Sequence, residues 1–137
     1  MFEPRTQITV FLRNKPGRFA ELCDILYGSG VDVRAMCVNH DADFGVVRMV
    51  VDDPEAATRA LSLEHILFIT TEVLVAVVPN RSGMAAGLGH KLAQAGINIE
   101  YTYFSSCEPN TRSLMVFKVA DLARALKALS ESSSEYN

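Results

Sequence analysis

The sequence predicts an α+β fold in which two units of the order β-α-β-β-α-β follow one another along the chain. Three observations lead to this prediction: the sequence repeats itself, each copy alternates strand-like and helix-like segments, and no flexible linker separates the copies. With 137 residues and 49% apolar side chains, the chain can bury a substantial core. This composition excludes a wholly disordered protein.

The internal repeat is the strongest of these observations. One constant offset superposes three marked positions of the two copies: Asn14 on Asn80, Gly17 on Gly83, and Gly30 on Gly96. Beyond the next hairpin the offset grows by two, so that Asp53 falls on Asp121, which indicates a longer hairpin in the second copy. Two copies predict two domains, which we place at residues 1–72 and 73–137.

The elements of the first copy each have a local signal. Apolar residues spaced at i, i+3, i+4 and i+7 after Gly17 predict a helix whose core face carries Phe19, Leu22, Cys23 and Leu26. Pro54 is well placed to open a second helix that runs to about Leu63. The β-branched or alternating segments predict four strands, at residues 8–12, 31–38, 45–51 and 67–71. This order is that of a ferredoxin-like unit with an antiparallel sheet and helices on one face.

The second copy repeats these elements but ends differently. Residues 97–105 and 114–119 predict strands, and a second helix uses Leu122, Ala125, Leu126 and Leu129. The remaining tail, residues 131–137, is polar and rich in serine, so the second copy is expected to lack its last strand. Residues 70–73, between the copies, contain no turn-forming residue. They therefore predict one bent strand that passes from the first sheet into the second.

Composition also excludes several classes of partner and cofactor. The net charge of −3 gives no basic footprint for nucleic acid, and no apolar run is long enough to span a membrane. Cys23, Cys37 and Cys107 lie far apart without CxxC spacing, and the histidines lack metal-ligand spacing. We therefore expect a cytoplasmic protein with no cofactor and no metal.

The strand-to-helix loops carry the functional signal. They read Asn14-Lys15-Pro16-Gly17-Arg18 and Asn80-Arg81-Ser82-Gly83-Met84, and residues 95–99 read Ala-Gly-Ile-Asn-Ile. Over residues 7–130 this pattern resembles a tandem pair of ACT domains, the small regulatory modules that sense amino acids. Ser82 stands where the family usually has proline, and Asp32 stands in the first copy where the second has Asn98.

The resemblance implies that a free amino acid binds where these loops meet the edge strand of a partner domain. That domain is either the other copy or part of a second chain. Free N–H groups of a first helical turn and side-chain amides can bind the carboxylate and ammonium of such a ligand. The candidate ligand-binding residues are Asn14, Lys15, Pro16, Gly17, Arg18, Asn80, Arg81, Ser82, Gly83, Met84 and Asn98. Which copy is competent stays open at this point.

The expected function is that of a non-enzymatic sensor that modulates a partner metabolic enzyme. The alternatives are a structural oligomerisation module, a regulatory subunit with no ligand of its own, and a small enzyme that uses Cys107 or a histidine. A missing last strand would expose the apolar edge of residues 74–78. The other copy, residues 1–7 or a second chain could cover that edge. We expect a homodimer, with twice the 15.0 kDa mass of one chain.

Overall fold

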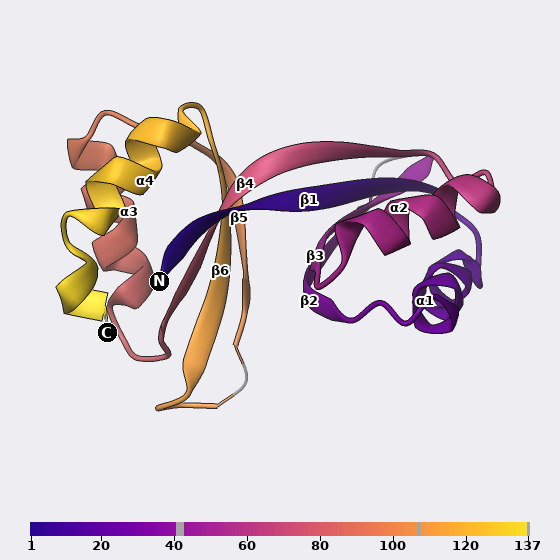
Figure 1. Ribbon diagram of the computed structural model, residues 1–137, viewed down its shortest axis with the longest axis horizontal. Coiled ribbons are helices and arrows are strands. Elements are labelled where there is room, and N and C mark those ends of the chain that lie inside the picture. Colours follow the sequence, from indigo (N-terminus) through magenta and orange to yellow (C-terminus); the bar gives the residue numbers. More distant parts are fainter. Residues whose placement is uncertain (41–42, 107, 137) are drawn as a thin grey trace. The chain divides into compact units, whose positions relative to one another are not determined.

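The computed structural model describes residues 1–40, 43–106 and 108–136, and these contain six strands, four α-helices and one short 3₁₀-helix. In chain order the elements are β1 (Phe2–Arg13), α1 (Arg18–Gly28), β2 (Val33–His40), β3 (Phe44–Val51), α2 (Pro54–Leu63), β4 (Phe68–Pro79), α3 (Met84–Gln94), β5 (Ile99–Ser105), β6 (Arg112–Val119), α4 (Leu122–Ser130) and η1 (Ser133–Tyr136) (Figure 1). This arrangement confirms two tandem ferredoxin-like units.

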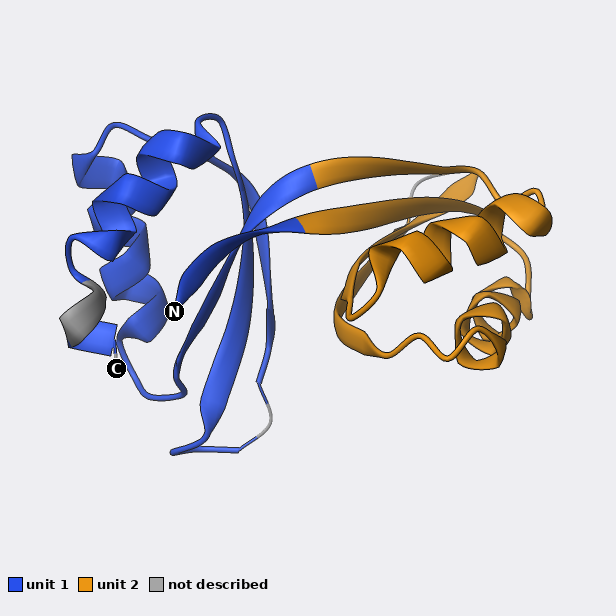
Figure 2. Cartoon of the chain, viewed as in Figure 1, with its two compact units in different colours: residues 1–5, 72–137 blue, residues 6–71 orange. Residues whose placement is uncertain are grey.

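Two compact units divide the chain, one of residues 6–71 and one of residues 1–5 together with 72–137 (Figure 2). Two long strands, β1 and β4, contribute residues to both units. Residues 68–79 form one uninterrupted strand, which confirms that a single strand connects the two copies. The strands are hydrogen-bonded in the one order β2-β3-β1-β4-β6-β5, where the sequence predicted two sheets. The first five residues of the chain fall in the unit of the second repeat.

The unit of residues 6–71 has the strand order β2-β3-β1-β4. β3 pairs antiparallel with both β1 and β2. Alternate residues of β1, namely Ile8, Val10 and Leu12, pack with the buried face of α1 and α2 in one core. Phe19 differs from the prediction, because its side chain is 48% exposed although helical spacing assigns it to the core face. The helix begins at Arg18, so Phe19 lies in its first turn and precedes the buried residues Leu22 and Leu26.

The unit of residues 1–5 and 72–137 has the strand order β1-β4-β6-β5. Met1 N donates to Val77 O at 2.9 Å, and Val77 N donates to Met1 O at 2.8 Å. Such a reciprocal pair is the hydrogen-bonded pair of an antiparallel ladder. The N-terminal segment therefore covers the edge that the second repeat leaves open. A second chain is not needed there, so this edge no longer supports the expectation of a homodimer.

The C-terminal segment completes the core of the same unit. Tyr136, in η1, is only 4% exposed, although the polar tail that contains it gives no sign of a core residue. Its ring meets the ring of Phe2 edge to face, with centroids 5.5 Å apart and planes at 87°. The N-terminal strand is therefore held by a side-chain contact as well as by its backbone hydrogen bonds.

The Phe2–Tyr136 contact predicts an energetic coupling. Phe2→Ala should lower the free energy of unfolding by about 1.5–3 kcal/mol, because it removes a largely buried aromatic side chain. In a double-mutant cycle with Tyr136→Ala, we expect a coupling of about 0.5–1.5 kcal/mol, typical of an aromatic pair. Urea unfolding followed by circular dichroism measures both values, and exchange of the Val77 amide should accelerate in Phe2→Ala.

The control is Phe19→Ala, which removes the same side chain from an exposed position and should change stability by roughly 0.5 kcal/mol or less. A coupling energy of zero within error would contradict the inferred contact.

Candidate functional site

Both repeats fix the start of the loop in the same way. Asn14 N donates to Asp43 O at 3.3 Å, and Asn80 N donates to Thr111 O at 2.6 Å. In each copy, the asparagine is therefore held by its backbone to the turn between the two middle strands. The two acceptors are related by the same larger offset that the sequence shows beyond the hairpin.

A glycine with left-handed backbone geometry closes each loop. Gly17 has φ 87° and Gly83 has φ 88°, and each is the N-cap residue of the following helix. No side chain caps α1 or α3 within the described part of the chain. A Cβ built on either glycine meets no atom within 4 Å, so the space in front of both loops is open. First-turn N–H groups beside open space can donate hydrogen bonds to a carboxylate.

The first loop borders a small hollow of about 150 Å³, which we call the basic hollow. Arg13, Lys15 and Arg18 line it, and no acidic residue is among its lining residues in the described part of the chain. The opposite wall is the end of β2 and includes His40, whose Nε2 lies 3.4 Å from Asn14 Nδ2. A concave site lined by one sign of charge raises the local concentration of the opposite ion. This hollow therefore favours an anionic group such as a carboxylate.

Two of its cations differ in their surroundings. Arg18 Nη1 lies 2.7 Å from Glu21 Oε2 in the first turns of α1, so its charge is partly compensated. Lys15 is exposed and has no ion-pair partner among residues 1–40, 43–106 and 108–136. Among the residues that the structure describes, Lys15 is therefore the cation of the first loop without an ion pair.

The second loop has its side chains engaged within its own unit. Asn80 Nδ2 donates to Glu108 O at 2.7 Å, and Arg81 Nη2 donates to Glu135 O at 3.3 Å. Met84 is 5% exposed in the core, and its sulfur accepts from Arg81 Nε at 3.5 Å. Pro16 and Ser82, by contrast, are exposed at equivalent places of the two loops. The two loops share a backbone conformation, but the side chains of the second loop are hydrogen-bonded within their own unit.

Asn98 is exposed and follows the C-terminal end of α3. The loop of residues 80–83 precedes the N-terminal end of the same helix. A helix of 11 residues is about 16 Å long, so the two lie at opposite ends of it. Within one copy, the structure does not bring Asn98 to its own loop.

The residues that sequence reasoning missed are those that the hollow adds to the loop, above all Arg13, Phe19 and His40. The repeat gives no signal for two of them, because Arg13 superposes on Pro79 and His40 on Ser106. Cys107, the nucleophile of the alternative enzyme, lies outside the described residues. Among those that are described, no group of acidic, cysteine or histidine side chains could hold a metal ion. In the same residues, no helix is both long and apolar enough to cross a membrane.

The left-handed glycines give a prediction about stability. Gly17→Ala and Gly83→Ala should each destabilise the protein by about 1–2 kcal/mol, because an L side chain is strained at positive φ even in open space. Gly28→Ala is the matched control, since Gly28 is helical, lacks the positive φ and also has no atom within 4 Å of a built Cβ.

We expect Gly28→Ala to be neutral or stabilising by up to about 1 kcal/mol in urea unfolding. Equal effects of all three substitutions would show that the positive φ of Gly17 and Gly83 does not make these positions more sensitive to a side chain than Gly28.

Comparisons with known proteins agree with this arrangement. Residues 5–136 match the family model described as an ACT domain pair. Among solved structures, protein BT0572 from Bacteroides thetaiotaomicron is 30% identical with a TM-score of 0.88, over 96% of this chain and 90% of that chain. The ligand-free regulatory subunit of aspartate kinase from Thermus thermophilus is 17% identical with a TM-score of 0.67, over 95% of each chain. Its counterpart from Thermus flavus is 19% identical with a TM-score of 0.64, over 96% of this chain and 94% of that chain.

At these lower identities the aspartate kinase subunits share the fold of this chain. No curated protein matches the sequence. Because the family model covers nearly the whole chain, this protein belongs to the ACT domain pair family.

Proposed function

We propose that this protein is a regulatory protein that binds a small free amino acid in the basic hollow and so modulates a partner metabolic enzyme. The observation that carries the proposal is the first loop itself, where Lys15, Asn14 and the uncapped first turn of α1 border one hollow. Membership of the ACT domain pair family supports it, as does the shared fold with regulatory subunits of aspartate kinase. In this proposal the protein regulates and does not catalyse.

The chemistry of the basic hollow fits the two charged groups of an amino acid. Lys15 and the amides of the first turn of α1 would bind the carboxylate, with the favourable helix dipole behind them. The side-chain oxygen of Asn14 can accept from the ammonium. Leu12 and Val47 also line the hollow, which at about 150 Å³ leaves room for a short side chain only.

We assign the ligand to the first copy for two reasons. Lys15 is available, whereas its counterpart Arg81 already donates to Glu135 O and to the sulfur of Met84. The second reason is that the C-terminal segment contacts both the second loop and α3. Arg81 donates to Glu135 O, and Lys91 Nζ donates to Ser132 Oγ at 2.7 Å. The second loop therefore has the same backbone conformation as the first, but its cation, Arg81, is already engaged within its own unit.

A matched pair of loop variants tests this assignment. A thermal-shift screen of the twenty standard amino acids should identify a ligand, which stabilises by about 2.7 kcal/mol at 100 times its Kd. Calorimetry should then show about tenfold weaker binding for Lys15→Gln, equivalent to about 1.4 kcal/mol, because one charged contact is lost. Arg81→Gln, the same position of the second loop, should bind as the wild type does.

The opposite pattern would assign the ligand to the second copy. If no amino acid stabilises the protein, the ligand proposal is wrong, and a structural module without a ligand is the better description.

We also propose a cytoplasmic homodimer, in which Asn98 of a second chain contributes to the ligand site. Light scattering should give twice the 15.0 kDa mass of the chain. Asn98→Ala should then weaken binding about tenfold under dimeric conditions, as for the loss of a buried hydrogen bond. A constant mass equal to that of a single chain at all concentrations would contradict the dimer and remove Asn98 from the site.

A further inference from the structure

The two helices of the unit of residues 6–71 border a groove that neither loop site uses. Its volume is about 600 Å³, and its lining residues include Asp24 and Ile25 of α1, Leu63 of α2 and Glu64 directly after it. α1 is about 16 Å long, which is the reach of about five residues of extended chain. The groove therefore has the length of a short peptide segment.

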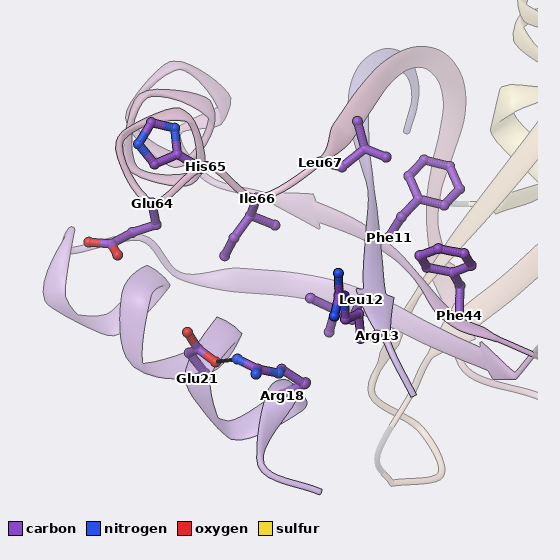
Figure 3. Close-up of a pocket in the computed structure, with 10 residues that line it drawn as sticks. All are labelled: Phe11, Leu12, Arg13, Arg18, Glu21, Phe44, Glu64, His65, Ile66 and Leu67. Carbon is purple, nitrogen blue, oxygen red and sulfur yellow. Dashed lines mark hydrogen bonds and ion pairs between the residues drawn. The ribbon is translucent and has the colours of Figure 1, made fainter. Parts of the chain in front are cut away.

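The charged residues that line this groove are all acidic in the described part of the chain. They are Glu21, Asp24 and Glu64. Glu21 is paired with Arg18 at 2.7 Å, whereas Asp24 and Glu64 form no ion pair with any residue that the structure describes. Figure 3 shows Glu21 and Glu64 in the adjoining pocket, which shares both carboxylates with the groove but also includes Arg18. We call the space between α1 and α2 the acidic groove.

In the second repeat, the equivalent face of the helices contacts the C-terminal segment of residues 132–136. A Cβ built on Gly87 of α3 would meet Tyr136 Oη at 3.6 Å, and Tyr136 is 4% exposed. Lys91 Nζ donates to Ser132 Oγ at 2.7 Å and lies 3.5 Å from Glu135 Oε1. This helical face therefore accommodates a short segment that carries one aromatic side chain and one charge.

The offsets of the repeat relate the two faces residue by residue. Glu21 superposes on Gly87 with the offset of α1, and Glu64 superposes on Ser132 with the larger offset of α2. In the first repeat, however, the chain after Glu64 leads into β4. Among the described residues, the lining of the acidic groove comes only from residues 17–29 and 60–64. The first repeat therefore leaves open the face that the second repeat covers with its own chain.

The two faces differ in the sign of their charge. In the second repeat, the cation Lys91 meets the anion Glu135 of the covering segment. In the first repeat, Ile25 stands at the position of Lys91, and Asp24 stands at the position of His90. A segment that suits the acidic groove therefore carries cations where the C-terminal segment carries an anion. The same C-terminal segment from a second copy of this chain has the wrong sign.

Apolar surface beside the carboxylates provides an anchoring point. Leu63 is 78% exposed at the end of α2, and Ile25 is half-buried in the lining of the same groove. The small side chains of Ala20 and Ala60 leave room beside them. A large apolar side chain that packs here would be removed from water together with Leu63, which favours binding.

We propose that the acidic groove docks a short basic segment of another protein, about five residues long, in which arginine or lysine side chains flank one large apolar side chain. Its cations meet Asp24 and Glu64, and its apolar side chain packs against Leu63 and Ile25. The segment takes the place that residues 132–136 hold in the second repeat. This inference goes beyond the proposed function, because the groove docks such a segment whether or not the basic hollow holds an amino acid.

The test titrates the full-length ¹⁵N-labelled protein with a synthetic peptide, capped at both ends, in which one tyrosine lies between two pairs of arginines. We expect saturable shifts of the amide signals of residues 20–28 and 60–64. The signals of residues 86–94 should stay unchanged, because the C-terminal segment covers that equivalent stretch of the second repeat. Equal shifts in both repeats would contradict a docking site in the first.

A pair of double variants separates the groove from the net charge of the protein. Asp24→Asn combined with Glu64→Gln should weaken peptide binding about tenfold, because two carboxylates lose their charge. The matched control is Glu55→Gln combined with Glu72→Gln, which removes the same charge from exposed positions outside the groove. The control should bind the peptide as the wild type does. Equal binding by the two double variants would overturn the inference.

Peptide variants test the anchor and the sign of the charge. Serine in place of the tyrosine should weaken binding about tenfold, and Leu63→Ser should have a similar effect on the parent peptide. A peptide with glutamates in place of the arginines should not bind. Equal binding of the tyrosine and serine peptides, or no saturable shift at all, would show that the inference is wrong. If residues 20–28 shift instead as the protein alone is concentrated, a second copy occupies the groove and the basic segment is the wrong occupant.

Discussion

The antiparallel pairing of β1 with β4 is the interaction on which both compact units depend. Phe11 pairs with Leu67 in one unit, and Met1 pairs with Val77 in the other. Both pairs belong to the same register, since each step forward in β1 is matched by one step back in β4. Because side chains alternate between the faces of a sheet, a slip of one residue would turn the core residues of both units outward. One register therefore fixes two cores, and the buried contact of Phe2 with Tyr136 opposes such a slip.

Local signals in the sequence were sufficient to predict most elements. The loop glycines and Pro54 are signals of this kind, and the repeat extends them to the second copy. The repeat also superposes Asp53 on Asp121, and in the structure each is an N-cap whose carboxylate accepts an amide hydrogen bond. The N-terminal strand and Tyr136 were not predictable in this way. Their positions depend on contacts with residues far away in the sequence, and neither segment has a sequence pattern that indicates those contacts. Helical spacing assigned Phe19 to the core wrongly, because a residue in the first turn of a helix can lie beyond the edge of the core.

The candidate sites show the same division. Residues 14–18 could be singled out because the loop backbone recurs in the second copy. Arg13 and His40, which line the basic hollow, could not be predicted in this way, because the repeat places Pro79 and Ser106 at their positions in the second copy. The two loops also show that a repeated backbone does not preserve a binding site, because the neighbours of Lys15 and Arg81 differ. Function in this chain is therefore assigned from side chains and their surroundings and not from the fold alone.

The contribution of residues 1–5 to the second unit has a consequence for synthesis on the ribosome. Residues 6–71 can fold as soon as they have emerged, because their contacts lie among themselves. The first residues of the chain must wait for a partner that is translated much later, since Met1 and Val77 are 76 residues apart. Contacts of such long sequence separation form slowly. During that interval the N-terminal segment is an unpaired extension of the unit of residues 6–71, and a late step of folding joins it to Val77 and Tyr136, which are translated after that unit.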